Sequence, residues 1–122
     1  MVDGCPDGNG CTLQEAQTVC SSVFGSDTSG IVFEPTTKAI NDDVLQTADD
    51  VTGGDYEYWI GVNSSDLTYH SNGNPVSLAS IPWASGHPKS QYDCVYGRSG
   101  TNKWYSHTCD TSWLYTICEM TS

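Results

Sequence analysis

The stretch that decides the fold is a segment rich in cysteine and aromatic residues in the second half of the chain. It reads WASGHPKSQYDCV over residues 83–95, KWYSHTC over residues 103–109 and ICE over residues 117–119. Residues 83–118 hold three of the six cysteines, three of the four tryptophans, two of the three histidines and three of the four lysines and arginines. Because cross-links, rings and cations are concentrated here, the segment predicts both a structural anchor and a binding surface.

The size and charge of the chain narrow the class of protein. Its 122 residues predict a single domain over residues 1–122, large enough to bury a core of its own. Fifteen carboxylates against four lysines and arginines give a formal net charge of −11, which repels nucleic acid and anionic lipid. No apolar run approaches the roughly 18 residues of a membrane span. We therefore expect neither a nucleic-acid partner nor membrane insertion.

The six cysteines include no Cys-x-x-Cys pair, which favours three disulfides over a zinc site or a redox dithiol. Disulfides form in oxidising compartments, so the chain is expected to be secreted and extracellular. Residues 1–5 lack the basic start and apolar run of a signal peptide. Our interpretation is a mature secreted domain with an added initiator methionine.

Two helices precede a run of short strands. Thr12 and Glu15 form a capping-box pattern that predicts a helix over residues 13–24. Asn41 is a favourable N-cap and predicts a second helix over residues 42–51. This order of helices and strands indicates an α+β fold with antiparallel pairing. Strands are expected at residues 30–33, 56–62, 93–96, 103–106 and 114–118.

Several short motifs of the chain form a pattern that is known from one family. The motifs are Trp59-Ile60-Gly61, Trp83, Asp93-Cys94-Val95, Trp104, Cys109 and Ile117-Cys118-Glu119. With them, residues 12–120 resemble the C-type lectin-like domain family. The resemblance implies two helices and two small antiparallel sheets with a long loop region. It also implies the disulfides Cys20–Cys118 and Cys94–Cys109, which leaves Cys5–Cys11 as the third.

The family's sugar-binding members hold Ca²⁺ in the long loop region, and the ligands they use are missing here. Those members carry Glu-Pro-Asn or Gln-Pro-Asp, a Glu before the Asp-Cys-Val strand, and Asn-Asp after the core Trp. The matching residues are His87-Pro88-Lys89, Tyr92 and Tyr105-Ser106. Ca²⁺ prefers six to eight oxygens, several from carboxylates. No cofactor is therefore expected, and calcium is not expected at this loop.

Cations and phenols stand where the calcium ligands would be. Their N–H and O–H groups can bind sugar oxygens directly, and Tyr69 and Tyr96 add rings that can stack on a sugar. The sequence thus predicts a calcium-independent lectin for N-acetylated or acidic sugars, with glycans or glycoproteins as partners in defence or cell recognition. The candidate carbohydrate-binding residues are His87, Lys89, Tyr92, Tyr105, His107, Arg98 and Lys103.

Other interpretations stay open at this point. His87 and Lys89 are alternatively ordinary exposed loop residues, and Tyr92 and Tyr105 half-buried strand residues. The tryptophans are expected in the core and His70 at the surface. No Gly-x-Ser-x-Gly elbow accompanies the serines, so the chain is not expected to be an enzyme.

Two rival functions are a protein-binding domain of the same fold and an acidic mineral- or ice-associated protein. Paired sites would raise avidity, so a homodimer is an expectation that the sequence leaves open. Asn63-Ser64-Ser65 matches a glycosylation sequon, and its occupancy is left open too.

Overall fold

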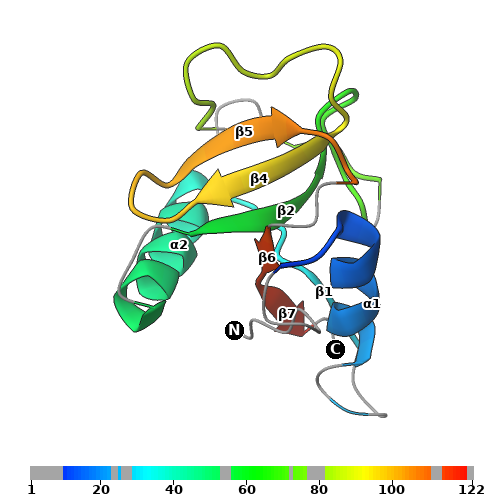
Figure 1. Cartoon of the computed structure of the whole chain (residues 1–122), viewed down its shortest axis with the longest axis vertical. Helices are drawn as coiled ribbons and strands as arrows, with labels where there is room; N and C mark the ends of the chain where they lie inside the picture. The colour runs from blue at the N-terminus through cyan, green and yellow to red at the C-terminus, as the bar shows by residue number, and fades with distance from the viewer. Residues whose placement is uncertain are drawn as a thin grey trace.

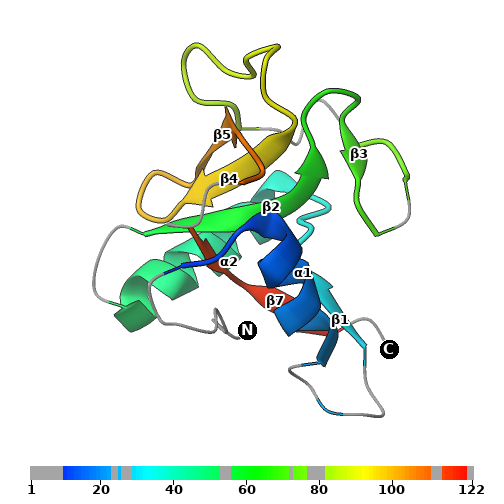
Figure 2. The same ribbon diagram turned by 45° about the vertical axis from the view of Figure 1, so that its right-hand side comes forward.

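Two sheets and two helices make up the described part of this computed structural model, which covers residues 10–22, 25, 29–52, 56–71, 73–76, 82–110 and 114–120. The helices lie on opposite sides of the central strand (Figures 1 and 2). The α+β prediction is confirmed. In chain order the elements are α1 (Leu13–Ser22), β1 (Gly30–Val32), α2 (Lys38–Thr52), β2 (Glu57–Asn63), β3 (Thr68–Tyr69), β4 (Cys94–Arg98), β5 (Lys103–His107), β6 (Tyr115–Thr116) and β7 (Cys118–Met120).

The first helix begins with the predicted capping box. The Thr12 N–H donates to Glu15 Oε1 at 2.9 Å, and the Glu15 N–H donates to Thr12 Oγ1 at 3.2 Å. These reciprocal bonds satisfy two donors that a helix start leaves open. Residues 23 and 24, included in the predicted helix, lie outside the described residues.

The second helix begins earlier than predicted, and Asn41 is not its N-cap. Thr37 Oγ1 accepts the Ile40 N–H at 3.1 Å, so Thr37 caps α2. Asn41 lies inside the helix and is fully buried. Its Oδ1 accepts the Trp104 Nε1–H at 2.7 Å, and its Nδ2 donates to Asn102 O at 2.9 Å. The prediction failed because Asn41 satisfies a tertiary partner instead of the helix end.

The larger sheet has the order β3-β2-β4-β5, with β6 paired in parallel to β2. The smaller sheet pairs β1 with β7 in antiparallel fashion. The single strand predicted over residues 114–118 is therefore divided at Ile117 between the two sheets. β3 is a further short strand that the sequence did not predict.

The central strand β2 buries side chains on both faces, as its aromatic and β-branched sequence predicts. Tyr58 and Ile60 pack in one cluster with Leu45 of α2, and Trp59 packs with Ala16 of α1 in another. Trp59 and Trp104 are 0% and 1% exposed, which confirms that they are core residues. Trp83 is partly buried against the first cluster, and Trp113 lies outside the described residues.

Two of the three predicted disulfides are confirmed. Cys20–Cys118 joins α1 to β7, and Cys94–Cys109 joins the start of β4 to the segment after β5. Their sequence separations of 98 and 15 residues correspond to about 4–5 and about 3 kcal/mol in the chain-entropy model. Cys5 lies outside the described residues, so Cys5–Cys11 stays a prediction. Within the described ranges, no helix is long and apolar enough to cross a membrane.

Candidate functional site

The long loop, residues 82–93, arches over the β4–β5 hairpin (Figure 1) and is fixed to the edge of β5. The Trp104 N–H donates to Pro82 O and the Ala84 N–H donates to Trp104 O, both at 2.9 Å. Farther along β5, the Ser106 N–H donates to the imidazole Nδ1 of His87 at 3.0 Å. The loop thus satisfies backbone groups that an edge strand would otherwise leave open.

Ser106 forms hydrogen bonds with the residues at both ends of the His87–Lys89 segment. Its hydroxyl oxygen accepts the Lys89 N–H at 2.8 Å and lies 3.0 Å from His87 Nδ1. Because the Ser106 N–H needs a lone pair on Nδ1, the His87 ring carries its proton on Nε2. Burial, followed by the charges of Lys89 and His107, lowers the pKa of His87. His87 is therefore a neutral support for the loop near pH 7, rather than the cationic donor that the sequence suggested.

Five aromatic rings form a continuous chain along the hairpin and the long loop. Tyr96 and Tyr105, register partners on β4 and β5, stack with centroids 5.0 Å apart and planes 12° apart. The other ring pairs meet edge to face. The centroid distances are 5.2 Å for His87 and Tyr105, 5.8 Å for His107 and Tyr96, and 5.6 Å for Tyr92 and His107. All five side chains are partly buried. Tyr105 packs between two other rings, so its ring supports the surface and does not offer a free face, whereas Tyr92 lies at the end of the chain of rings.

Burial also lowers the pKa of His107, which keeps a second member of the ring chain neutral near pH 7. By contrast, Tyr69 is 8% exposed, and its hydroxyl donates to Pro35 O at 2.7 Å. The expectation that Tyr69 stacks on a sugar is wrong, because its ring belongs to the core.

Lys89 and Tyr92 wall a pocket of about 250 Å³ at the long loop. The Tyr92 N–H donates to Lys89 O at 3.1 Å, and the Ser64 Oγ–H donates to Tyr92 O at 2.7 Å. These bonds fix the backbone from which both walls project. Lys89 is the one ionised side chain among the lining residues, which are Ser64, Ser65, Pro88, Lys89, Ser90 and Tyr92.

Arg98 and Lys103 lie at the other end of the hairpin. They are register partners beside the β4–β5 turn, whereas Cys94 and His107 pair at the end nearest the long loop. Four residues of strand separate the two pairs, or about 13 Å at a rise of about 3.3 Å per residue. The predicted cations therefore form two separate groups, and only Lys89 lines the pocket.

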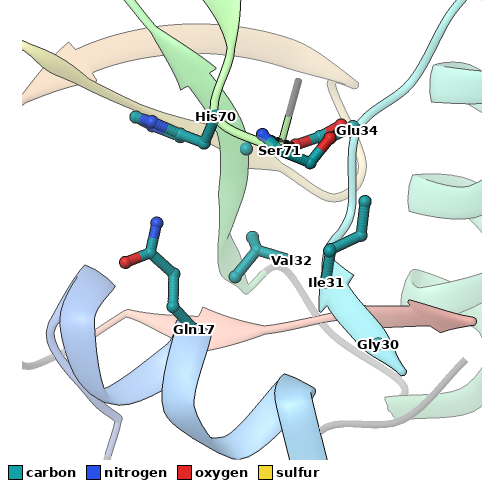
Figure 3. Close-up of a pocket in the computed structure, with 8 residues that line it drawn as sticks. Gln17, Gly30, Ile31, Val32, Glu34, His70 and Ser71 are labelled. Atoms are coloured by element: carbon teal, nitrogen blue, oxygen red, sulfur yellow. Dashed lines mark hydrogen bonds between the residues drawn. The ribbon is translucent and has the colours of Figure 1, made fainter. Parts of the chain in front are cut away.

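A second pocket, of about 200 Å³, lies between α1, β1 and the turn after β3 (Figure 3). The Ser71 N–H and O–H donate to the Glu34 carboxylate at 2.9 and 2.6 Å. His70 lines the same pocket, and burial, the largest influence, lowers its pKa. His70 is half-buried rather than at the predicted surface position. Sequence reasoning did not predict this pocket, which Gly61 of the Trp59-Ile60-Gly61 motif also lines.

No group of three or more His, Cys, Asp or Glu side chains that could hold a metal ion occurs within the described ranges. The model of the Lectin C-type domain matches residues 9–120. The chain belongs to the C-type lectin domain family. Members of this family are generally non-enzymatic binding proteins, and nothing in the site indicates catalysis. A lectin-like role in binding carbohydrate or protein follows, and a disulfide-linked lectin domain is consistent with an extracellular protein.

Solved C-type lectin structures share this fold at low sequence identity. C-type lectin CEL-I from Cucumaria echinata is 18% identical with a TM-score of 0.75, covering 90% of this chain and 83% of that one. Human lithostathine is 22% identical with a TM-score of 0.72, covering 92% and 86%. TC14 from the tunicate Polyandrocarpa misakiensis is 17% identical with a TM-score of 0.67, covering 93% and 92%. A search of curated proteins found no match.

Sequence reasoning missed the part that serines play in this lectin domain. Ser106 entered the prediction only as a position lacking the family's acid, and Ser64 only as part of the Asn63-Ser64-Ser65 sequon. The structure makes Ser106 the anchor of the long loop and Ser64 a support of Tyr92. The available signal was that Ser106 occupies a position where the family places a calcium ligand of this loop.

Proposed function

We propose that this chain is a carbohydrate-binding lectin, that its site is the Lys89–Tyr92 pocket, and that it binds without calcium. One observation carries the proposal. Ser106 occupies the position at which the family resemblance implies a calcium-binding acid. Its hydroxyl oxygen accepts the Lys89 N–H and lies within hydrogen-bonding distance of His87 Nδ1. The loop is thus held by hydrogen bonds between protein groups, in the region where relatives would use the ion.

The donor set does not fit calcium. Ca²⁺ needs six to eight oxygen ligands, including carboxylates. The residues at the matching positions are His87, Lys89, Tyr92, Tyr105 and Ser106, none of which is an acid or an amide. The His87 Nδ1 already accepts the Ser106 N–H, and the Lys89 ammonium would repel a cation. No step of the proposed recognition therefore passes through a metal.

The pocket offers the chemistry that a sugar needs. The Lys89 ammonium can donate charge-assisted hydrogen bonds to hydroxyl, acetamido or carboxylate oxygens. The Tyr92 ring and Pro88 supply an apolar surface for the C–H face of a pyranose. N-acetylated or acidic sugars are the proposed ligands, and glycans or glycoproteins are the proposed partners.

Two solved structures with the same fold are carbohydrate-recognition domains, which supports testing this chain for sugar binding. The cow C-type carbohydrate-recognition domain of CD23, 16% identical with a TM-score of 0.66, was solved in the presence of a GlcNAc2Man3 oligosaccharide. The mouse scavenger receptor C-type lectin structure is likewise a carbohydrate-recognition domain. At such identities the likeness shows the fold alone, so sugar binding by this chain rests on its own pocket.

A glycan-binding screen in the presence of a chelator tests the proposal. We expect binding to survive chelation and to weaken by about tenfold or more in Lys89→Ala and Tyr92→Ala, because each removes one wall of the pocket. Lys103→Ala is the matched control, since it removes an exposed lysine at the far end of the hairpin. Failure of every saccharide to bind at millimolar concentration would favour the protein-binding rival.

A further inference from the structure

The lysines and arginines of the chain differ in their ionic surroundings. Lys38 Nζ lies 2.6 Å from Asp42 Oδ2, and Arg98 Nε lies 4.0 Å from Glu57 Oε1. Neither Lys89 nor Lys103 has a carboxylate within 4.0 Å among the residues that the structure describes, and of these two only Lys89 lines the pocket. In a chain with fifteen carboxylates and four lysines and arginines, an unpaired ammonium in a pocket is available for an anion.

The backbone N–H and C=O groups of Lys89 are both hydrogen-bonded within the protein. The Lys89 N–H donates to Ser106 Oγ at 2.8 Å, and Lys89 O accepts the Tyr92 N–H at 3.1 Å. Tyr92 is held in turn by Ser64 and by the ring of His107. A charge that projects from a fixed segment loses less conformational freedom when a ligand binds, which favours specific recognition.

The other polar side chains that line the pocket are neutral, and two of them already donate hydrogen bonds within the protein. The Ser64 hydroxyl donates to Tyr92 O, and the Ser65 hydroxyl donates to Asn63 Oδ1 at 2.7 Å. No carboxylate is among the lining residues of the pocket. The lining therefore carries a charge of +1 from Lys89 alone, inside a protein of net charge −11.

This local charge decides between the two sugar classes. A ligand that covers Lys89 removes water from the ammonium, and a neutral acetamido or hydroxyl oxygen only partly replaces that solvation. A carboxylate or sulfate replaces it with an opposite charge, so the Coulomb attraction between the two ions adds to the hydrogen bond that any oxygen acceptor would make.

Resting on the proposed function, we infer that the pocket selects a saccharide bearing a carboxylate or sulfate group. Lys89 binds that anionic group, and Tyr92 contacts the C–H face of the ring. Lys89 is then the specificity-determining residue of the site. A uronic acid and a sulfated sugar share this chemistry, and matched pairs of ligands separate them.

The experiment titrates the full chain, with chelator present, against two matched pairs followed by NMR chemical-shift changes. The pairs are methyl glucuronide against methyl glucoside, and galactose 6-sulfate against galactose. We expect at least one charged member to bind about tenfold more tightly than its neutral partner, and that member identifies the anionic group. Lys89→Gln should remove the preference, Lys89→Arg should largely keep it, and Lys103→Gln should leave it unchanged.

The remaining outcomes separate this inference from the proposed function. Equal affinity for charged and neutral members, with no change in Lys89→Gln, overturns the inference and leaves a neutral-sugar lectin. A preference that persists in Lys89→Gln but disappears in Lys103→Gln overturns it too, because the anion then binds at the hairpin turn. Absence of binding by all four sugars, and by N-acetylglucosamine, overturns both.

Discussion

The imidazole Nδ1 of His87 accepts the backbone N–H of Ser106 at 3.0 Å. One side chain of the long loop thereby completes the hydrogen bonding of an edge strand. The same serine returns its hydroxyl to the loop by accepting the Lys89 N–H at 2.8 Å. Because Ser106 is 2% exposed, these bonds are shielded from water, and the position of the pocket depends on them.

Replacing Ser106 by Ala should loosen the loop. The Lys89 N–H loses its acceptor, which costs about 1–3 kcal/mol when the donor stays shielded from water. We expect a lower free energy of unfolding in urea and weaker sugar binding together. Ser85→Ala, an exposed serine of the same loop, is the control and should change stability by less than about 0.5 kcal/mol. Equal stability of the two variants would contradict this function for Ser106.

The pH dependence of the free energy of unfolding should report the protonation of the His87 imidazole. Burial first, and then Lys89 and His107, lower its pKa below the ordinary 6.5. The unfolded chain therefore binds the proton more readily, so this histidine's contribution is complete above about pH 6.5 and is lost as pH falls through the folded pKa. Protonation at Nδ1 would also place two donors against each other at Ser106.

Urea unfolding at several pH values, comparing the wild type with His87→Asn, measures this contribution. The Asn Oδ1 can accept the Ser106 N–H without titrating. We expect a shallower fall in stability below pH 6.5 for the variant, although His70 and His107, whose pKa values are also lowered, keep part of the slope. Identical slopes would show that His87 titrates alike in the folded and unfolded chains.

The buried contact between Asn41 and Trp104 should be costly to break. Asn41→Leu leaves the Trp104 Nε1–H and the Asn102 carbonyl without their partner. Two unsatisfied groups cost about 2–4 kcal/mol together. Lys38→Ala, which removes an exposed i,i+4 ion pair of the same helix, should cost less than about 0.5 kcal/mol. Thermal unfolding of both variants measures the difference, and similar losses would argue against the buried network.

Gly61 should not tolerate a side chain. A Cβ there would lie 2.6 Å from Glu34 Cγ and 3.0 Å from the Val32 carbonyl oxygen. Gly61→Ala is therefore expected to destabilise the fold by about 1–3 kcal/mol. In Gly97→Ala the nearest atom is the flexible end of Leu45, at 3.0 Å, so a smaller loss is expected. Denaturant unfolding compares the two, and a larger loss for Gly97→Ala would contradict the packing argument.

The sequence predicts what depends on neighbours along the chain. Thr12 and Glu15 are three residues apart, and their capping box forms as the pattern indicates. The pattern at Asn41 looks equally local, yet its amide binds Trp104, 63 residues away, and only the tertiary structure reveals that choice. Likewise, residues 114–118 read as one apolar strand, but they pass from one sheet to the other at Ile117.

At the candidate site, too, the sequence does not reveal which residues the tertiary structure brings together. The sequence marks Lys89 and Tyr92 as members of a loop that lacks calcium ligands, and these residues do wall a pocket. It also groups Arg98 and Lys103 with them, because these two residues follow the loop closely along the chain. The antiparallel register of β4 and β5 places those two cations at the opposite end of the hairpin.

The decisive measurement for calcium-independent sugar binding is a calorimetric titration of the full chain with a saccharide that binds in the glycan screen, first with chelator and then with added calcium. We predict the same affinity in both conditions and a loss of about tenfold or more in Lys89→Ala. Binding that requires calcium, and that is unaffected by Lys89→Ala, would contradict it.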